Sequence, residues 1–273
     1  IFCRKCKESD SSYPLKSPDT KVDMKGVHVD GESLGSGVAT TVVDASVEEC
    51  AAHEITNLNS RAKMNNLKQR GITELTVRQT NSHSLYYFTT RTLGVPGLSK
   101  RQGRNKVIWK WEGRKAFIDV SNTSDLIEEH PLQPSTVVVS VKTFWHYAPL
   151  NSIGEVPQTS ATLTTQIDFK GAIPSTLMNK LAPKFLSTVS NSRKKFDKSK
   201  EIDAAKRKQI VEKMEDLEII GSETIASKFK EVEGAVKISK SLSHAQIWVK
   251  TEKGGIGWGR CLVNVTVGLE EVA

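Results

Sequence analysis

The sequence contains no apolar run approaching the roughly 18 residues that a membrane-spanning helix requires. It also has few cysteines, four in 273 residues. Cysteines this sparse exclude a disulfide framework and favour a reducing, cytosolic setting. With 37% hydrophobic and 26% charged residues, the composition is that of a soluble globular protein. The length fits one large domain, or one domain and part of another.

A start methionine and a signal peptide are also missing. The chain begins with Ile1, and no charged stretch, apolar core and cleavage site follow it. We therefore expect no secretory leader in this sequence, and the missing methionine suggests a fragment of a longer protein.

Three short motifs resemble catalytic or metal-binding patterns but lack an essential part of each. Gly31–Gly35 reads GESLG, a nucleophile-elbow pattern, but strands are expected on both sides instead of a strand and a helix. His53 begins an H-E-x-x-H pattern, but Asn57 stands in place of the second histidine. Cys3 and Cys6 have zinc-knuckle spacing, but a closed zinc site takes four ligands and no second pair follows. We expect no catalytic residues, no metal and no cofactor.

Positive charge is concentrated in one stretch. Residues 180–213 contain eleven Lys or Arg against four acidic residues, so that this stretch carries +7 of the total net charge of +8. A peripheral contact with an anionic membrane and a merely solvated helix both fit this charge. A nucleic-acid partner is not expected, because charge alone supports it.

The first sixty residues predict a tail, two strands and a helix. Residues 1–22 show no periodicity and are expected to be a tail or linker. Two strands are expected between residues 25 and 43. Ser46 is a candidate N-cap, and Glu49 completes a capping box for a helix packed on one face.

The central part of the chain predicts an antiparallel sheet. In the last of its strands the polar residues Thr162, Thr164, Gln166 and Asp168 alternate with apolar ones. This pattern predicts one wet and one dry face. The strands are expected at residues 72–79, 84–93, 105–113, 114–121, 135–147 and 157–169.

A helix is expected to follow the sheet directly. The strand is expected to end at Gly171. Pro174 suits the first helical turn, where its missing N–H is not needed. We therefore expect an α+β fold, a curved antiparallel sheet wrapped around a long C-terminal helix. The apolar stripe of that helix consists of Leu177, Met178, Leu181, Phe185 and Val189.

The C-terminal residues repeat an earlier segment. Gly257–Ala273 aligns without a gap to Gly35–Ala51, and six of the seventeen positions are identical. The offset of 222 residues is the size of a domain. We expect a charged helical linker over 200–241 and, over 242–273, a second copy cut off as its first helix begins.

Three segments resemble the START domain, a lipid-binding module named after a steroidogenic regulatory protein. They are VVDASVEECA (42–51), Glu129-His-Pro131, and QIDFKGAIPSTLMNKL (166–181). The resemblance implies a START-like domain over 23–199 with the helix-grip fold and a lipid-sized cavity. It further implies a non-enzymatic protein that binds a lipid, such as a phospholipid or sterol, for transfer or sensing.

One residue departs from this pattern. Pro183 lies about nine residues into the expected C-terminal helix, where its ring should kink the helix. In this family the helix is thought to help gate the cavity, so the kink is either a hinge or a break without function.

Strand parity and helical spacing select the candidate ligand-binding residues. Arg78 and Arg91 are polar candidates for a head group. A solid core requires the same apolar residues, so a scaffold with a filled core remains an alternative. A hydrolase that uses the same cavity is a less favoured alternative. The apolar candidates are Val139, Val141, Trp145, Leu163, Ile167, Leu177, Leu181 and Phe185.

Overall fold

The computed structural model describes two compact units, Ile1–Ser199 and Lys200–Ala273. The residues that it describes are 12–27, 35–60, 71–94, 96–171, 183, 185–213, 236–238, 246–251 and 257–262.

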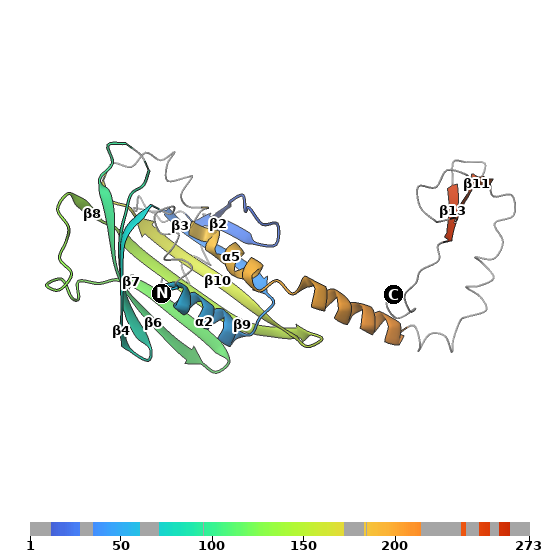
Figure 1. Cartoon of the computed structure of the whole chain (residues 1–273), viewed down its shortest axis with the longest axis horizontal. Coiled ribbons are helices and arrows are strands. Elements are labelled where there is room, and N and C mark those ends of the chain that lie inside the picture. Colours follow the sequence, from blue (N-terminus) through green and yellow to red (C-terminus); the bar gives the residue numbers. More distant parts are fainter. Residues whose placement is uncertain are drawn as a thin grey trace. The chain divides into compact units, whose positions relative to one another are not determined.

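The first unit is built on one ten-stranded sheet in the order β1-β2-β3-β10-β9-β7-β6-β5-β4, with β8 parallel to β6 and every other pair antiparallel (Figure 1). The curved antiparallel sheet expected from the sequence is confirmed. The strands are β1 (Ser12–Pro14), β2 (Asp23–Val27), β3 (Gly35–Val43), β4 (Ile72–Asn81), β5 (Ser84–Arg91), β6 (Lys100–Glu112), β7 (Lys115–Asn122), β8 (Thr136–Val138), β9 (Ser140–Ile153) and β10 (Val156–Asp168).

Two helices, α2 (Val47–Asn57) and α5 (Thr188–Lys195), lie across one face of this sheet (Figure 1). At the start of α2 the Ser46 hydroxyl accepts from the Glu49 N–H, and the Glu49 carboxylate accepts from the Ser46 N–H. The capping box is therefore confirmed. It fixes where the helix begins and so which residues turn toward the sheet.

The main apolar core lies between the sheet and these helices. Val47, Cys50 and Ala51 of α2 belong to the same buried cluster as Leu186 and Val189, which is fully buried on α5. The sheet supplies every second residue of its long strands to this cluster, including Ala116, Ile118, Trp145, Tyr147, Ala161 and Leu163.

The prediction that one face of β10 is exposed to solvent is wrong. Thr164 is fully buried, and Thr162 and Gln166 are only 6% exposed. Thr164 lies directly opposite Phe144, and Thr162 opposite His146. Aromatic side chains on this face shield the shorter threonines, so the alternation predicted the orientation of the side chains but not their exposure.

The hairpin of β9 and β10 is longer than the sequence predicts. The expected strand 135–147 is divided into β8 and β9, and β9 continues through Pro149 to Ile153 before the turn at Gly154, which has φ 58°. Pro149 is tolerated because the neighbouring strand β7 pairs with β9 only as far as Tyr147. No partner strand requires an N–H from Pro149 on that side.

The loop between β7 and β8 is held on β6 by two buried polar side chains. Arg104 donates to the carbonyls of His130 and Asp125, the second at 3.0 Å, and Gln102 donates to the carbonyl of Pro131 at 3.5 Å. Burial lowers the pKa of the Arg104 guanidinium. The Glu129-His-Pro131 segment thus supplies backbone acceptors that satisfy side chains beneath the loop.

The structure differs from the tail expected over residues 12–22. Ser12–Pro14 forms β1 at the edge of the sheet, and Val22 is 3% exposed within the core. Asp19 lies in the turn between β1 and β2, where its carboxylate accepts from the backbone N–H of Lys21 at 3.0 Å. Contacts with residues distant in sequence hold this turn, so the local sequence pattern did not predict it.

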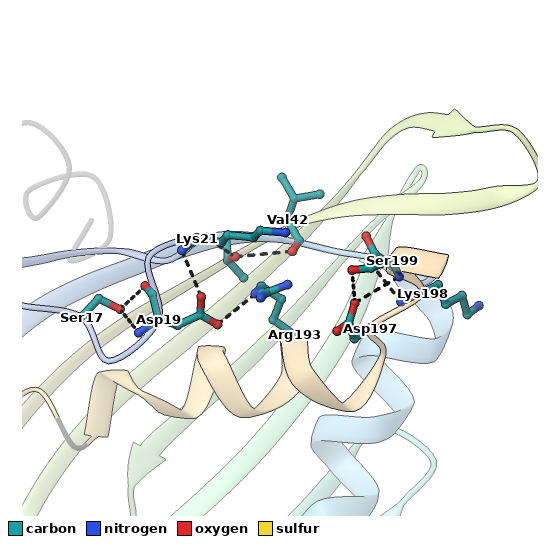
Figure 2. A network of polar contacts seen from close by, with 10 residues as sticks. Ser17, Asp19, Lys21, Val42, Arg193, Asp197, Lys198 and Ser199 are labelled. Carbon is teal, nitrogen blue, oxygen red and sulfur yellow. Dashed lines mark hydrogen bonds and ion pairs between the residues drawn. The ribbon is translucent and has the colours of Figure 1, made fainter. Parts of the chain in front are cut away.

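A buried ion pair joins this turn to α5. Figure 2 shows Arg193 directed toward Asp19, with 3.0 Å between the Arg193 Nε and the Asp19 Oδ2. The two side chains are 15% and 6% exposed. The hydrogen bond from Arg193 lowers the pKa of the Asp19 carboxyl. Just beyond α5, the Lys198 N–H donates to the Asp44 carboxylate at 3.1 Å.

We predict that Arg193→Gln lowers the free energy of unfolding by about 1–3 kcal/mol at pH 7, because it leaves the Asp19 carboxylate poorly paired. The lowered Asp19 pKa means that the ion pair stabilises the fold above the ordinary carboxyl pKa. Its contribution declines as the pH falls below about 4. Urea titrations of both proteins from pH 7 to pH 3.5 measure this difference.

The matched control is Lys195→Gln, which removes an exposed cation from the same helix. It should change the free energy of unfolding by less than about 0.5 kcal/mol. Equal losses in the two variants would show that Arg193 acts only through the charge of the helix.

Much of the expected C-terminal helix, including Pro174, Leu177 and Leu181, lies outside the described residues. The Pro183 carbonyl accepts from the Ser187 N–H at 2.9 Å, which is helical geometry. The α5 helix begins at Thr188, directly after Ser187.

The second unit contains a three-stranded antiparallel sheet, β11 (Val236–Ile238), β12 (Gln246–Thr251) and β13 (Gly257–Leu262). Residues 199–213 are helical and include the boundary between the units. In the described parts of the chain, no helix is both long enough and apolar enough to cross a membrane.

Candidate ligand cavity between the sheet and the helices

Among the described residues of the first unit, the buried apolar side chains form two clusters. The larger contains Trp145 and Leu163, and the smaller contains Val139, Ile167 and Phe169. A cavity of about 190 Å³ is lined by residues of both clusters. A single solid core would have closed this gap, which strand parity alone does not reveal.

The structure brings together seven of the ten residues selected from the sequence. Leu177 and Leu181 lie outside the described residues, and Arg78 does not line the cavity. The seven residues on its wall are Val139, Val141, Trp145, Leu163, Ile167, Phe185 and Arg91.

Arg78 lies elsewhere on the surface. Its guanidinium forms an ion pair with Glu129, and the two side chains are 48% and 54% exposed. Such an exposed pair contributes little to stability. The alternation of β4 did not reveal this position, because Glu129 is distant in sequence and its loop folds back onto the strand.

Two threonines form the middle of the cavity wall. Thr143 and Thr165 lie directly opposite each other, between the pair Trp145–Leu163 and the pair Val141–Ile167. Their hydroxyl groups are 2.8 Å apart and bond to each other. The sequence reasoning omitted both residues because they are polar, although their parity matches that of the apolar wall.

One end of the wall is basic and comes from β5 and β6. Arg101 lies opposite Arg91 in the register of these strands, and Asn105 lies opposite Tyr87. All four residues line the cavity. The sequence reasoning missed Arg101 because the polar run KRQGRN gives no alternation, so the strand was expected to begin only at residue 105. It passed over Asn105, the first residue of that strand, because this residue is polar. Extending the parity of the strand backwards would have found Arg101.

Arg101 also holds the end of β10. Its guanidinium donates to the carbonyls of Phe169 at 2.9 Å and Lys170 at 3.3 Å, and to that of Ser99. Lys170 and Gly171 have φ values of 52° and 74°, the left-handed region in which glycine is favoured. Arg101 thus stabilises the turn at which the chain leaves the sheet.

The other end of the cavity wall is formed by α2, through Glu54 and Leu58. Burial raises the pKa of the Cys50 thiol to about 12. Burial and the negative charge of Glu54 raise the pKa of the Tyr147 phenol well above its usual range. Neither group ionises at neutral pH, so neither is an activated nucleophile there.

Within the described ranges, no group of three or more His, Cys, Asp or Glu side chains is placed to hold a metal ion.

We predict that Tyr147→Phe leaves the free energy of unfolding unchanged or raises it by up to about 1 kcal/mol. The Tyr147 hydroxyl is buried and has no hydrogen-bond partner among the described residues, so its removal relieves a desolvation cost. Chemical denaturation measures the effect. As the control, Tyr86→Phe removes a hydroxyl that donates to Asp125 at 2.7 Å and should lower stability by about 0.5–1.5 kcal/mol. A clear loss of stability in Tyr147→Phe would reveal a partner for this hydroxyl.

The similarity of this chain to known proteins lies in its structure. The sequence matches no family model and no curated protein. The human StarD13 lipid transfer and protein localization domain superposes with a TM-score of 0.53 at 15% identity, over 72% of this chain and 94% of that one. Human StAR-related lipid transfer protein 5 gives 0.54 at 12% identity, over 71% and 90%. A STAR-related lipid transfer protein from Xanthomonas axonopodis gives 0.52 at 16% identity, over 68% and 99%.

The first unit has a START-like fold. Sequence identities of 12–16% show the fold alone, and each of these superpositions covers 90–99% of the similar chain. The START resemblance inferred from the sequence is confirmed at the level of the fold.

Proposed function

We propose that the first unit binds a lipid or another hydrophobic ligand in the cavity between the sheet and the helices, without catalysing a reaction on it. The observation that carries this proposal is the cavity of about 190 Å³ that residues of both apolar clusters line. The START-like fold supports it, since the similar structures are those of lipid transfer proteins and domains.

The cavity volume limits the ligand. The cavity volume of about 190 Å³ is smaller than that of typical small-molecule sites, which is about 300–1,000 Å³. A whole phospholipid therefore requires the cavity to widen. Phe185 and Thr188 line it from the helical side, so a displacement of α5 would enlarge it. Each CH₂ group that enters contributes about 0.8 kcal/mol of binding free energy.

A peripheral contact with an anionic membrane belongs to the same proposal. The end of α5 carries Arg193, Lys194 and Lys195 in sequence, and the last two are exposed. Each exposed cation near an anionic surface contributes about 1 kcal/mol. This contact would bring the cavity close to its source of lipid.

The first experiment is organic extraction and mass spectrometry of the full chain purified from a eukaryotic host. We expect a stoichiometric lipid in the wild type and its loss in Leu163→Trp and Val139→Trp, because the larger ring fills the cavity. Circular dichroism should show that both variants remain folded. As the control, Ile108→Trp changes an exposed residue of β6 that does not line the cavity and should retain the lipid.

A folded wild type that carries no lipid and also binds none from mixed vesicles would refute the proposed lipid binding. It would favour a scaffold whose core is effectively filled. Loss of fold in both tryptophan variants, with lipid retained in the folded fraction, would assign these residues to the core instead.

We also propose that a second START-like copy follows a charged linker. It begins at about residue 235 instead of residue 242 as the sequence predicted, because β11 (Val236–Ile238) lies within the expected linker. The support comes from strand register. Val236 lies opposite Val249, as Tyr13 lies opposite Gly26, each 223 residues earlier. Ile247 lies opposite Cys261 as Met24 lies opposite Ala39, with offsets of 223 and 222. The two sheets thus match in pairing, with one residue fewer between the second and third strands.

A segment exchange tests the second copy in the full chain. Residues 23–43 are replaced by residues 246–265, and we expect a cooperatively folded first unit, because equivalent strands bury equivalent faces. In the control, one residue is deleted at the start of the inserted third strand, which turns every following side chain to the opposite face. If the exchange unfolds the first unit as completely as the control does, the two segments are not equivalent.

A further inference from the structure

Two arginines face each other at one end of the cavity. Arg91 and Arg101 are direct cross-strand neighbours on β5 and β6, and both line the cavity wall. We propose that this pair binds the oxyanion of an acidic amphiphile, a carboxylate or phosphate head group, while the ligand's apolar chain lies between the two apolar clusters. This inference rests on the proposed function and names the ligand class of the same site.

The hydrogen bonds of Arg101 leave its charge available. Its side chain is buried, with the residue 3% exposed, and a guanidinium carries five N–H donors. Three of them go to backbone carbonyls, which are neutral acceptors. The ion pairs of the described residues do not include Arg101. Two N–H donors and a buried positive charge therefore remain, and an oxyanion would satisfy both.

Asn105 adds an unsatisfied polar position to the same wall. It is 6% exposed, and its amide oxygen has no hydrogen-bond partner among the described residues. A buried polar atom without a partner is costly, and nearly all buried polar atoms in native structures have one. Asn105 lies four residues from Arg101 on β6, so a hydroxyl or amide group further along the ligand would supply the missing donor.

The charges also orient the ligand. Glu54 is at the opposite end, where it raises the pKa of Tyr147. Tyr147 pairs with Ala161 of β10, whereas Arg101 donates to the carbonyl of Phe169. Eight residues of extended chain separate positions 161 and 169, or about 26 Å. The negative head group is therefore expected at the arginines, with the apolar chain directed toward α2.

The test compares decanoate with decan-1-ol, which have equal chains but different charge, by calorimetric titration of the full chain at pH 7.5. We expect decanoate to bind about 10–100-fold more tightly than the alcohol, as charge-assisted hydrogen bonds at a buried site would give. Arg91→Gln should weaken decanoate binding about tenfold and leave decan-1-ol unchanged. Arg78→Gln removes an arginine outside the cavity and should change neither.

Two further probes separate head-group recognition from other effects. Decyl phosphate should behave like decanoate, whereas inorganic phosphate should not bind measurably, because it lacks the apolar chain. Bound [1-¹³C]decanoate, titrated by NMR, should show a carboxyl pKa below that of the free acid. A purely structural role of Arg101 in holding the β10 turn would not lower this pKa.

Equal affinity for decanoate and decan-1-ol in the wild type would overturn the anion site while leaving the hydrophobic cavity intact. So would an Arg91→Gln variant that loses both ligands equally, or tight binding of inorganic phosphate alone. If neither decanoate nor decan-1-ol binds, and no lipid is extracted from the chain, the proposed function itself fails.

Discussion

The register between β9 and β10 is the constraint on which the rest of the first unit depends. It places Trp145 opposite Leu163 and Val141 opposite Ile167, all on the face toward α2 and α5. A slip of one residue would turn this apolar wall away from the helices and bring Phe144 and Thr164 in its place. The helices pack on the sheet because this face is apolar, and the cavity exists because they do not fill it.

The cavity is a consequence of two helices held at separate places. The α2 helix is fixed by its capping box and by small buried residues such as Ala51, which allow close packing on the sheet. The α5 helix is held by the ion pair of Arg193 with Asp19 in the turn before β2. This pair is mostly buried, so it positions the helix more firmly than an exposed pair would. The wall that α5 contributes to the cavity is therefore tied to the edge of the sheet.

Polar groups at the two ends give the cavity a direction. Glu54 lies on the helical side at one end, and Arg91 and Arg101 lie on the sheet at the other. Arg101 combines two tasks, because its bonds to Phe169 and Lys170 also fix the turn at which the chain leaves β10. The segment QIDFKG thus turns, through its glycine and left-handed backbone, next to the buried guanidinium of Arg101.

The sequence by itself determined the antiparallel sheet, the capped helix α2 and the parity of the apolar wall, because these depend on local periodicity and capping chemistry. It did not determine that Thr164 is buried, that residues 12–22 join the sheet, or that Asp19 pairs with Arg193, since each depends on residues distant in sequence. Arg101 and Asn105 were missed as wall residues for a different reason, because they are polar and only the parity of their strand places them on the wall. Whether apolar residues of one parity enclose a solid core or a cavity is a matter of volume, and volume is decided only when the helices and the sheet are packed together.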